Sequence, residues 1–275
     1  MKSLFFIILF ISTGHFLMSQ MRDPIPVENL DTLRYIIQYE LRYQEDSTST
    51  RTLIEPMVLL AGDHISSFMS YNKLKRDAAS RAIQSQAEYN LFLTTYHHNN
   101  PMPRVLYTLY KNHPNGKVTF IQMIPPEFYH YTEAYKGFRW VMDTETKVAH
   151  GYTLQKATTY YGGRNWIAWF APELPINEGP YKFAGLPGLI VEIYDEKKHY
   201  HFVMTVFSKP EEPGFVDLRS DLRSQEISRK AFHEAWMRLM QDPFQAGGIQ
   251  ADPREMEIRR RQSQRRNNPI ELTAD

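Results

Sequence analysis

The sequence predicts an α+β fold, mostly antiparallel β, in which a curved, half-barrel-like sheet packs against one or two helices. The first observation is that apolar or aromatic residues alternate with mostly polar ones over 33–44, the period of a half-buried strand. The second is a succession of short apolar segments separated by turn residues. The third is that two segments, 71–94 and 228–242, break this alternation and favour helix.

The sheet is predicted to begin with three strands. Residues 33–43 form the first. Residues 53–62 form the second, in which Pro56 indicates a sheet edge or a bulge because proline cannot donate a ladder hydrogen bond. Residues 64–70 continue the sheet. Residues 71–94 then contain no Gly or Pro and are rich in Ala, Gln, Lys and Arg, which predicts a helix.

Most of the following chain is predicted to be strand. The pair Asn115-Gly116 readily takes the positive φ angles of a tight turn, so it predicts a hairpin between 104–111 and 117–124. The further strands are expected at 127–135, 138–143, 149–161, 165–172, 189–195 and 199–208, with turns at 144–147, 162–164 and 196–198.

An amphipathic helix packed on the sheet is predicted in residues 228–242. Ser228 is the expected N-cap, and Pro243 lies beyond the end. Residues at helical spacing form one apolar stripe, which consists of Ala231, Phe232, Ala235, Trp236, Leu239 and Met240.

Residues 1–20 have the anatomy of a secretory signal peptide. One positive charge at Lys2 precedes an apolar run, and a small residue stands near the end. Cleavage is expected after Ser19 or Gln20. The apolar run is shorter than the ~20 residues that span a bilayer, so no transmembrane segment is expected after cleavage.

The mature chain is expected to be a single β-rich domain, residues 21–250, followed by a basic C-terminal tail, residues 251–275. Six arginines between positions 254 and 266 give the tail its charge. Such a run is typical of a solvated tail or of the polar face of a helix. The alternative is a docking patch for anionic lipid or an acidic partner.

Charge and cysteine content exclude several classes of function. The signal peptide carries Lys2 and no acidic residue, so 31 of the 32 Lys and Arg remain and balance 31 Asp and Glu. No nucleic-acid partner is therefore expected. The absence of Cys excludes disulfides, a thiol nucleophile, a thiolate metal site and a lipidated N-terminal Cys. We expect an exported protein, periplasmic or extracellular, that is not a lipoprotein.

One long stretch carries a family resemblance. Residues 156–195, KATTYYGGRNWIAWFAPELPINEGPYKFAGLPGLIVEIYD, resemble the signature of the GLPGLI family, which is named for residues 185–190. The likeness extends to YELRYQED at 39–46, to LLAGDHISSFMSYN at 59–72 and to NNPIEL at 267–272. The resemblance implies an exported protein of a Bacteroidetes-type bacterium with a β-rich fold, no established activity and no catalytic residues to transfer.

The family motif itself has two interpretations. Pro187 followed by Gly188 fits a type II turn, so the motif predicts a corner that feeds the strand 189–195. Alternatively, Gly185 and Gly188 let backbone amides approach a ligand that Tyr181 and Phe183 flank. A phosphate cradle is disfavoured because no helix N-terminus follows the glycines.

Aromatic residues before the motif are either core or the wall of an apolar cleft in a curved sheet. Together with the motif they give the candidate ligand or partner contacts Tyr160, Arg164, Trp166, Trp169, Phe170, Tyr181, Gly185, Pro187 and Gly188. The ligand such a cleft would take is an apolar small molecule, a lipid or a strand of an envelope protein.

Two other chemistries remain as alternatives. His199 and His201 flank one strand residue and could clamp a transition metal, but the sequence shows no third ligand. Neither G-x-S-x-G nor H-E-x-x-H occurs, and the three glutamates Glu173, Glu178 and Glu192 are the candidates for paired-acid catalysis.

We therefore expect no metal, cofactor or catalytic residue. The function expected is non-enzymatic binding of an apolar ligand or a partner protein, with a hydrolase of unrecognised site or a metal-handling protein as the alternatives. The half-barrel curvature is drawn by analogy with periplasmic lipoprotein carriers, and this analogy concerns fold, not function.

Overall fold

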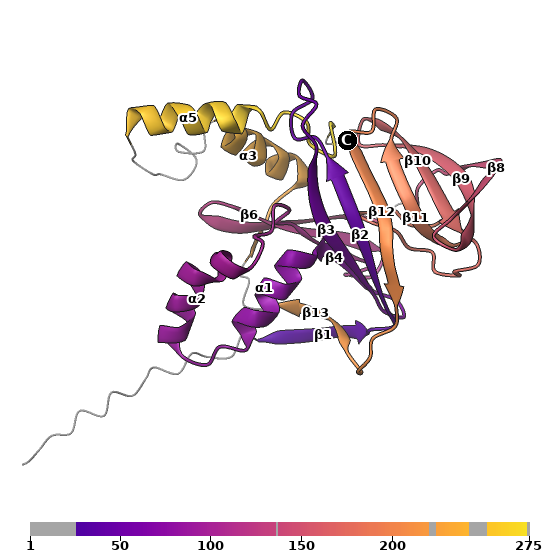
Figure 1. The fold of residues 1–275 in the computed structure, drawn as a ribbon, viewed down its shortest axis with the longest axis horizontal. Coiled ribbons are helices and arrows are strands. Elements are labelled where there is room, and N and C mark those ends of the chain that lie inside the picture. The colour runs from indigo at the N-terminus through magenta and orange to yellow at the C-terminus, as the bar shows by residue number, and fades with distance from the viewer. Residues whose placement is uncertain (1–25, 136, 220–223, 242–251, 274–275) are drawn as a thin grey trace, which may run out of the picture.

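The computed structural model describes residues 26–135, 137–219, 224–241 and 252–273, and the expected signal peptide lies outside them. Within these residues, a large open sheet of 12 strands forms the frame (Figure 1). Its order is β14-β7-β6-β5-β4-β3-β2-β12-β11-β10-β9-β8, and every neighbouring pair is antiparallel except β14 and β7. The predicted fold class, α+β and mostly antiparallel, is confirmed.

Strands that are neighbours in the large sheet are also consecutive in the chain, except in the pairs β14-β7 and β2-β12. The strands of this sheet are β2 (Tyr35–Tyr43), β3 (Leu53–Ala61), β4 (Ser66–Ser70), β5 (Thr108–Lys111), β6 (Lys117–Ile124), β7 (Glu127–Ala134), β8 (Val141–Ala149), β9 (Tyr152–Tyr161), β10 (Arg164–Ala171), β11 (Leu189–Asp195), β12 (Tyr200–Ser208) and β14 (Ser224–Glu226). A separate two-stranded sheet pairs β1 (Val27–Thr32) with β13 (Phe215–Arg219). The helices are α1 (Tyr71–Arg81), α2 (Gln86–Asn99), α3 (Arg229–Gln241) and α5 (Pro253–Gln264).

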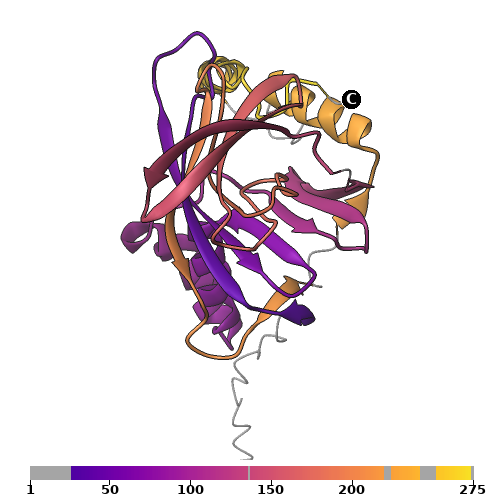
Figure 2. The same cartoon turned by 90° about the vertical axis from the view of Figure 1, so that its right-hand side faces the viewer.

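Alternation in β3 gives the sheet a core on each face. Leu59 and Met57 belong to the main core, whereas Val58 and Leu60 pack with Leu74 of α1 on the opposite face. The main core is covered by the segment 172–188 between β10 and β11, and Figure 2 shows the sheet curving around it.

The segment 172–188 fills the inside of the curved sheet. Phe183 is fully buried against Trp140 and Trp166, and the indole N–H of Trp140 donates to the carbonyl of Ala184 at 2.9 Å. The buried ammonium of Lys111 donates to the carbonyl of Gly179 at 2.9 Å. The interior of the half-barrel is therefore occupied by the chain itself.

Local predictions differ from the structure in the middle of the chain. The predicted helix 71–94 is two helices, because the chain leaves helical geometry after Arg81 and restarts at Ser85, whose Oγ accepts from the N–H of Glu88. The turn predicted at 144–147 lies inside β8, and the chain turns instead at His150 and Gly151, both with positive φ.

Two proline predictions also need correction. Pro56 lies opposite Glu40 in an inner strand, not at an edge. This is tolerated since the neighbouring β4 ends opposite Met57, so the ladder on that side has already stopped. The corner at Pro187 is not a type II turn: the N–H of Gly188 donates to the carbonyl of Leu186 at 2.8 Å, the hydrogen bond of a γ-turn.

The C-terminal predictions are partly confirmed. Ser228 caps α3, since its Oγ accepts from the N–H of Ala231 at 3.1 Å. Phe232 of the predicted stripe packs on Phe120 and Tyr131 of the sheet, with ring centroids 5.3 Å apart in both pairs. Pro243 lies outside the described residues. The arginine-rich run forms α5, and the chain then returns to the sheet.

Candidate functional site

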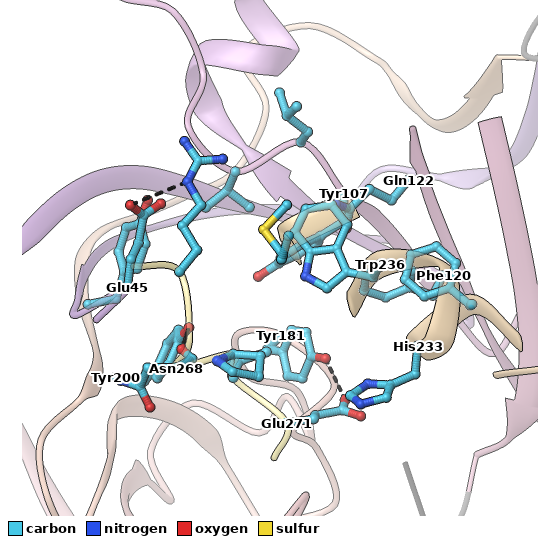
Figure 3. Close-up of a pocket in the computed structure, with 18 of the residues that line it drawn as sticks. Glu45, Tyr107, Phe120, Gln122, Tyr181, Tyr200, His233, Trp236, Asn268 and Glu271 are labelled. Carbon is cyan, nitrogen blue, oxygen red and sulfur yellow. Dashed lines mark hydrogen bonds and ion pairs between the residues drawn. The ribbon is translucent and has the colours of Figure 1, made fainter. Parts of the chain in front are cut away.

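A pocket of about 230 Å³ opens between the sheet, α3 and the C-terminal segment 266–273 (Figure 3). Strands β2, β6, β7 and β12 and the loop 104–107 supply one part of its wall, and residues from α3 and the C-terminal segment supply the rest. Its lining consists of Leu41, Tyr43, Glu45, Arg104, Val105, Leu106, Tyr107, Phe120, Gln122, Tyr131, Tyr181, Tyr200, Arg229, Phe232, His233, Trp236, Met240, Arg266, Asn268, Pro269, Ile270, Glu271 and Thr273.

The wall of this pocket is mainly aromatic. Phe120 and Tyr131 stack with ring centroids 5.1 Å apart, and Tyr107 lies 5.3 Å from Phe120. Tyr43 and Tyr200 form a second stack at 5.9 Å. In Figure 3, the side chains labelled on the two sides of the hollow face each other across an open centre. Such a wall binds flat or apolar groups through contact area.

The positions of these rings follow from strand and helix geometry. In β2 the period of two puts Tyr39, Leu41 and Tyr43 on the inner face. Antiparallel register then places Tyr200 opposite Tyr43. In α3 the helical spacing brings Phe232 and Trp236, four residues apart, to the same side.

A buried ionic cluster closes the inner end of the pocket. The ammonium of Lys182, 2 % exposed, lies 2.5 Å from Glu133 and 2.8 Å from Glu271. Arg229 pairs with the same two carboxylates. The hydroxyl of Tyr181 donates to Glu271 at 2.5 Å. These contacts satisfy charges that would otherwise be costly to bury.

The cluster fixes the charge state of its members. Burial alone would raise the pKa of Glu271, but the neighbouring Lys182 and Arg229 lower it to about 2. Burial alone would lower the pKa of Lys182, but Glu271, nearby tyrosines and Glu133 raise it well above its usual value. Glu271 is therefore a carboxylate at neutral pH, and Lys182 is an ammonium.

A second hollow of about 310 Å³ lies across this cluster. It is lined by Val118, Glu133, Ala134, Tyr135, Phe138, Tyr161, Lys182 and Arg229. Arg229 lines both hollows, while Glu271 lines the first and Lys182 the second. The ionic cluster is thus the partition between them.

Arg164 holds the C-terminal segment in place as a wall of the first pocket. Its guanidinium donates to the carbonyls of Ile270 at 3.0 Å and Pro269 at 2.7 Å, and to the side chain of Asn268 at 2.7 Å. It also forms a buried ion pair with Asp195 at 3.1 Å. The hydroxyl of Tyr200 donates to the carbonyl of Asn268 at 2.7 Å.

Several polar groups that line the pocket have unused hydrogen-bonding capacity. In the described part of the chain, no hydrogen bond engages the hydroxyls of Tyr43 and Tyr107, the amide of Gln122 or the indole N–H of Trp236. None of these atoms is sealed from solvent without a partner. Their residues line the pocket, where such groups are available to a ligand.

The nine candidate contacts that the sequence suggested do not form one site in the structure. Tyr181 lines the first pocket. Trp166 and Phe170 are buried in the core, and Arg164 serves the C-terminal segment. Trp169 lies under the ammonium of Lys147, 4.3 Å from its ring centroid. The remaining four do not line either hollow: Tyr160, Gly185 and Pro187 are exposed and Gly188 packs against backbone.

Sequence reasoning missed most of the pocket. Tyr43, Tyr107, Gln122 and Arg104 come from strands and a loop with no motif in common. Two signals pointed toward the site: the apolar stripe that includes Trp236, and the NNPIEL stretch at 267–272. Neither signal indicates that the two segments meet over the inner face of β2.

The residues of the alternative chemistries are dispersed. Glu178 pairs with Lys111, whereas Glu173 accepts from the N–H of Thr153. Glu192 pairs with Lys147 and lies 2.8 Å from His201. Burial alone would raise the pKa of Glu192, but His201 and Lys147 lower it to about 2. Each glutamate has its own partners, so they do not form one paired-acid site.

The two histidines also have different neighbours. His201 contacts Glu192, and His199 lies 3.5 Å from the guanidinium of Arg164. Among the residues that the structure describes, no group of three or more His, Cys, Asp or Glu is arranged to hold a metal ion. Among the same residues, no helix combines the length and apolar character needed to span a bilayer.

Comparison with known proteins found a match to a family model of unknown function and a similarity in fold to solved structures. A family model described as "Protein of unknown function (Porph_ging)" matches residues 163–192, from the turn after β9 into β11. No curated protein matches the chain.

Two structures of PNGF-II are similar in fold, one in space group C2 with a TM-score of 0.50 and one in P21 with 0.49. Both are 12 % identical and cover 74 % of this chain, which spans 32 % and 33 % of theirs. The chain thus spans about a third of those proteins, and at this identity the likeness concerns the fold alone.

Proposed function

We propose that this protein is an exported, non-enzymatic binding protein whose aromatic pocket takes a small, largely apolar ligand. The observation that carries the proposal is the combination of a wall built mainly from rings with polar groups that have no hydrogen-bond partner among the residues that the structure describes. Binding sites for small molecules commonly have this composition, since apolar walls supply contact area and a few polar groups fix orientation.

The size of the pocket favours a small molecule over a partner protein. Its volume of about 230 Å³ lies below the ~300–1,000 Å³ of pockets for drug-sized ligands. It fits a compact ligand or one end of a lipid. A protein interface instead needs on the order of 800 Å² of surface from each partner.

The charge state of Glu271 argues against its use as the general base of a hydrolase. Glu271 has a pKa of about 2 and is paired with Lys182 and Arg229. A general base works best with a pKa near the operating pH, so this carboxylate is a poor proton acceptor. It is suited to holding the wall of the pocket together.

Export and family membership are part of the proposal. The match to a family of unknown function covers residues 163–192, which lie within the stretch that resembles the GLPGLI signature. This overlap supports membership of that exported family. The signal-peptide anatomy of residues 1–20 and the lack of Cys support a free protein in the periplasm or outside the cell.

A titration with a neutral fluorescent probe tests the binding function. We expect 1-aminonaphthalene, whose emission depends on polarity, to give a saturable rise in fluorescence with the mature protein. Trp236→Ala removes one wall and should weaken binding at least tenfold. Met237→Ala, at the next position of α3 and outside the pocket lining, is the matched control and should bind as the wild type does. No saturable signal from the folded wild-type protein would refute the proposal.

A further inference from the structure

We infer that the ligand of the aromatic pocket is a small acid, an aromatic or apolar body with one anionic group that Arg104 binds at the rim. This inference deepens the proposed function and rests on it. It names the chemical class of the ligand and the residue that selects it.

Among the described residues, one of the cations that line the pocket has no carboxylate partner. Three arginines and two glutamates line the pocket. Arg229 pairs with Glu271, and Arg266 lies 3.8 Å from Glu45. For Arg104, no carboxylate of the described chain lies within ion-pair distance of the guanidinium. Among the described residues, Arg104 is therefore the lining cation without an ion-paired carboxylate, although its charge helps to lower the pKa of the buried Glu55, which burial raises.

Arg104 stands on an anchored backbone. Its N–H donates to the carboxylate of Glu55 at 3.3 Å, and Glu55 is itself buried and bonded to Ser70. The next residue, Val105, is 9 % exposed in the main core. An arginine that is fixed at its backbone, and whose guanidinium has no hydrogen bond or ion pair within the described part of the chain, is well suited to bind a carboxylate through two parallel hydrogen bonds.

Both rim arginines act on the same ring of the wall. Burial raises the pKa of Tyr43, the carboxylates of Glu45 and Glu55 raise it further, and the positive charges of Arg104 and Arg266 oppose these effects. Their guanidinium groups are thus close enough to the Tyr43 hydroxyl to influence its charge. Arg104 and the stacked rings of Tyr43 and Tyr200 line the same pocket, so a ligand whose anionic group binds Arg104 can place its apolar body against these rings.

A polar side chain inside the pocket adds a second requirement on the chemistry of the ligand. Gln122 is 7 % exposed and lines the pocket, and its side-chain amide has no hydrogen-bond partner among the described residues. The amide offers two donors and an acceptor, and the nearby pocket wall includes the Tyr107 hydroxyl. Leaving these groups unpaired on binding is costly, so the body of the ligand should carry a hydrogen-bonding atom.

Three probes that share one ring and differ in charge test this inference. Indole-3-acetate is anionic, indole-3-acetamide is its neutral isostere and tryptamine is cationic, and each keeps the indole N–H for Gln122. We expect calorimetry on the mature protein to show that the acetate binds at least tenfold more tightly than the acetamide, and that tryptamine binds most weakly. High salt should weaken the acetate most.

Arginine variants locate the anion. Arg104→Gln should lower the affinity for indole-3-acetate at least tenfold and leave that for indole-3-acetamide within twofold. Arg104→Lys should retain part of the preference, since a lysine keeps the charge but not the fork of donors. The matched control is Arg139→Gln, an exposed arginine that lines neither hollow, and it should leave all three affinities unchanged.

The outcomes separate this inference from the function on which it rests. If 1-aminonaphthalene binds saturably but indole-3-acetate and indole-3-acetamide bind with equal affinity, the proposed binding function stands. The inference that the ligand is an acid is then wrong. Binding of 1-aminonaphthalene without binding of indole-3-acetate leads to the same conclusion. Preference for tryptamine overturns the assignment of Arg104 and points to Glu45. Loss of 1-aminonaphthalene binding itself refutes the proposed function.

Discussion

Gly188 lies where the chain enters β11, and its backbone passes directly against that of Ala171. A Cβ at Gly188 would stand 2.2 Å from the carbonyl oxygen of Ala171, and backbone atoms cannot move aside as a side chain can. Gly188→Val should therefore lower the free energy of unfolding by about 3 kcal/mol, the upper part of the range for overpacking. Gly137→Ala is the control, since no atom lies within 4 Å of its added Cβ. An unchanged melting temperature for Gly188→Val would contradict this account of the motif.

Glu271 makes the stability of the protein depend on pH. Its pKa is about 2 in the fold against an ordinary 4.5, because Lys182 and Arg229 outweigh the effect of burial. A lowered pKa means that the stabilisation is complete above about pH 4.5 and is lost as the pH falls toward 2. Glu271→Gln should be less stable than the wild type at neutral pH, and the difference should shrink through this window.

Urea unfolding at a series of pH values measures the effect. Glu192, whose pKa is also about 2, contributes to the wild-type curve, so the difference between wild type and variant is the informative quantity. Glu234→Gln, at an exposed position of α3, provides the control and should run parallel to the wild type. A constant difference between wild type and Glu271→Gln across the window would show that Glu271 is not held as a carboxylate by its neighbours.

At the scale of elements, the segments that carry the family resemblance form one assembly. The turn before Arg164, the segment with Lys182 and the NNPIEL stretch lie far apart in the chain. In the structure Arg164 binds the backbone of the third segment, and Lys182 binds its carboxylate at Glu271. The turn before Arg164 also packs against the C-terminal segment. A Cβ at Gly162 would lie 2.9 Å from the side chain of Glu271, so the close approach of the two segments requires a glycine there.

Asn268 anchors the C-terminal segment to the sheet. Its side chain accepts from Arg164 and donates to the carbonyl of Gln44, both at 2.7 Å. Asn268→Ala removes both hydrogen bonds, leaving the carbonyl of Gln44 without this donor while Arg164 keeps its other partners, and should cost about 1–3 kcal/mol. It should also speed tryptic cleavage after Arg266, as measured by limited proteolysis.

The adjacent Asn267 offers a matched comparison. It is exposed and bonds to Ser47 and Asp46 of a surface loop. Asn267→Ala should cost below about 1 kcal/mol and leave the rate of cleavage nearly unchanged. If both variants had the same effect on stability and proteolysis, the buried contact with Arg164 would not be what holds the segment.

At the scale of the whole molecule, the curved sheet is open at both edges, β8 and β14, and its inside is filled by residues 172–188. The expected apolar cleft within the half-barrel is thus occupied by Phe183 and its neighbours, and the two hollows described above lie on either side of the ionic cluster. The curved sheet resembles a half-barrel, and the proposed ligand site lies beside α3 and the C-terminal segment.

Export is the prediction that concerns the entire chain. When the full sequence is expressed in a Gram-negative bacterium, we expect the protein in the periplasm or medium. The expected N-terminus is Gln20 or Met21, because the small Ser19 follows the apolar run. Mass spectrometry of the intact protein measures this directly. Recovery of the uncleaved chain from the cytoplasm would contradict the proposed export.

Local sequence patterns predicted much of the fold. Alternation located β2, and the pair Gly162-Gly163 located the turn between β9 and β10, since both glycines have positive φ. The helix α3 and its cap at Ser228 followed from spacing and capping chemistry. These features depend on neighbours within a few residues, which is the range that a pattern in one sequence reports.

The sequence by itself determined the class of fold, the positions of most strands along the chain and the stretch that resembles a family. Only the tertiary structure decided that Lys182 and Arg164 hold the C-terminal segment, and that Tyr43, Tyr107 and Trp236 share a pocket. The physical reason is that periodicity reports which face of an element is buried, whereas contacts between distant segments depend on how the sheet curves and on which segment fills it.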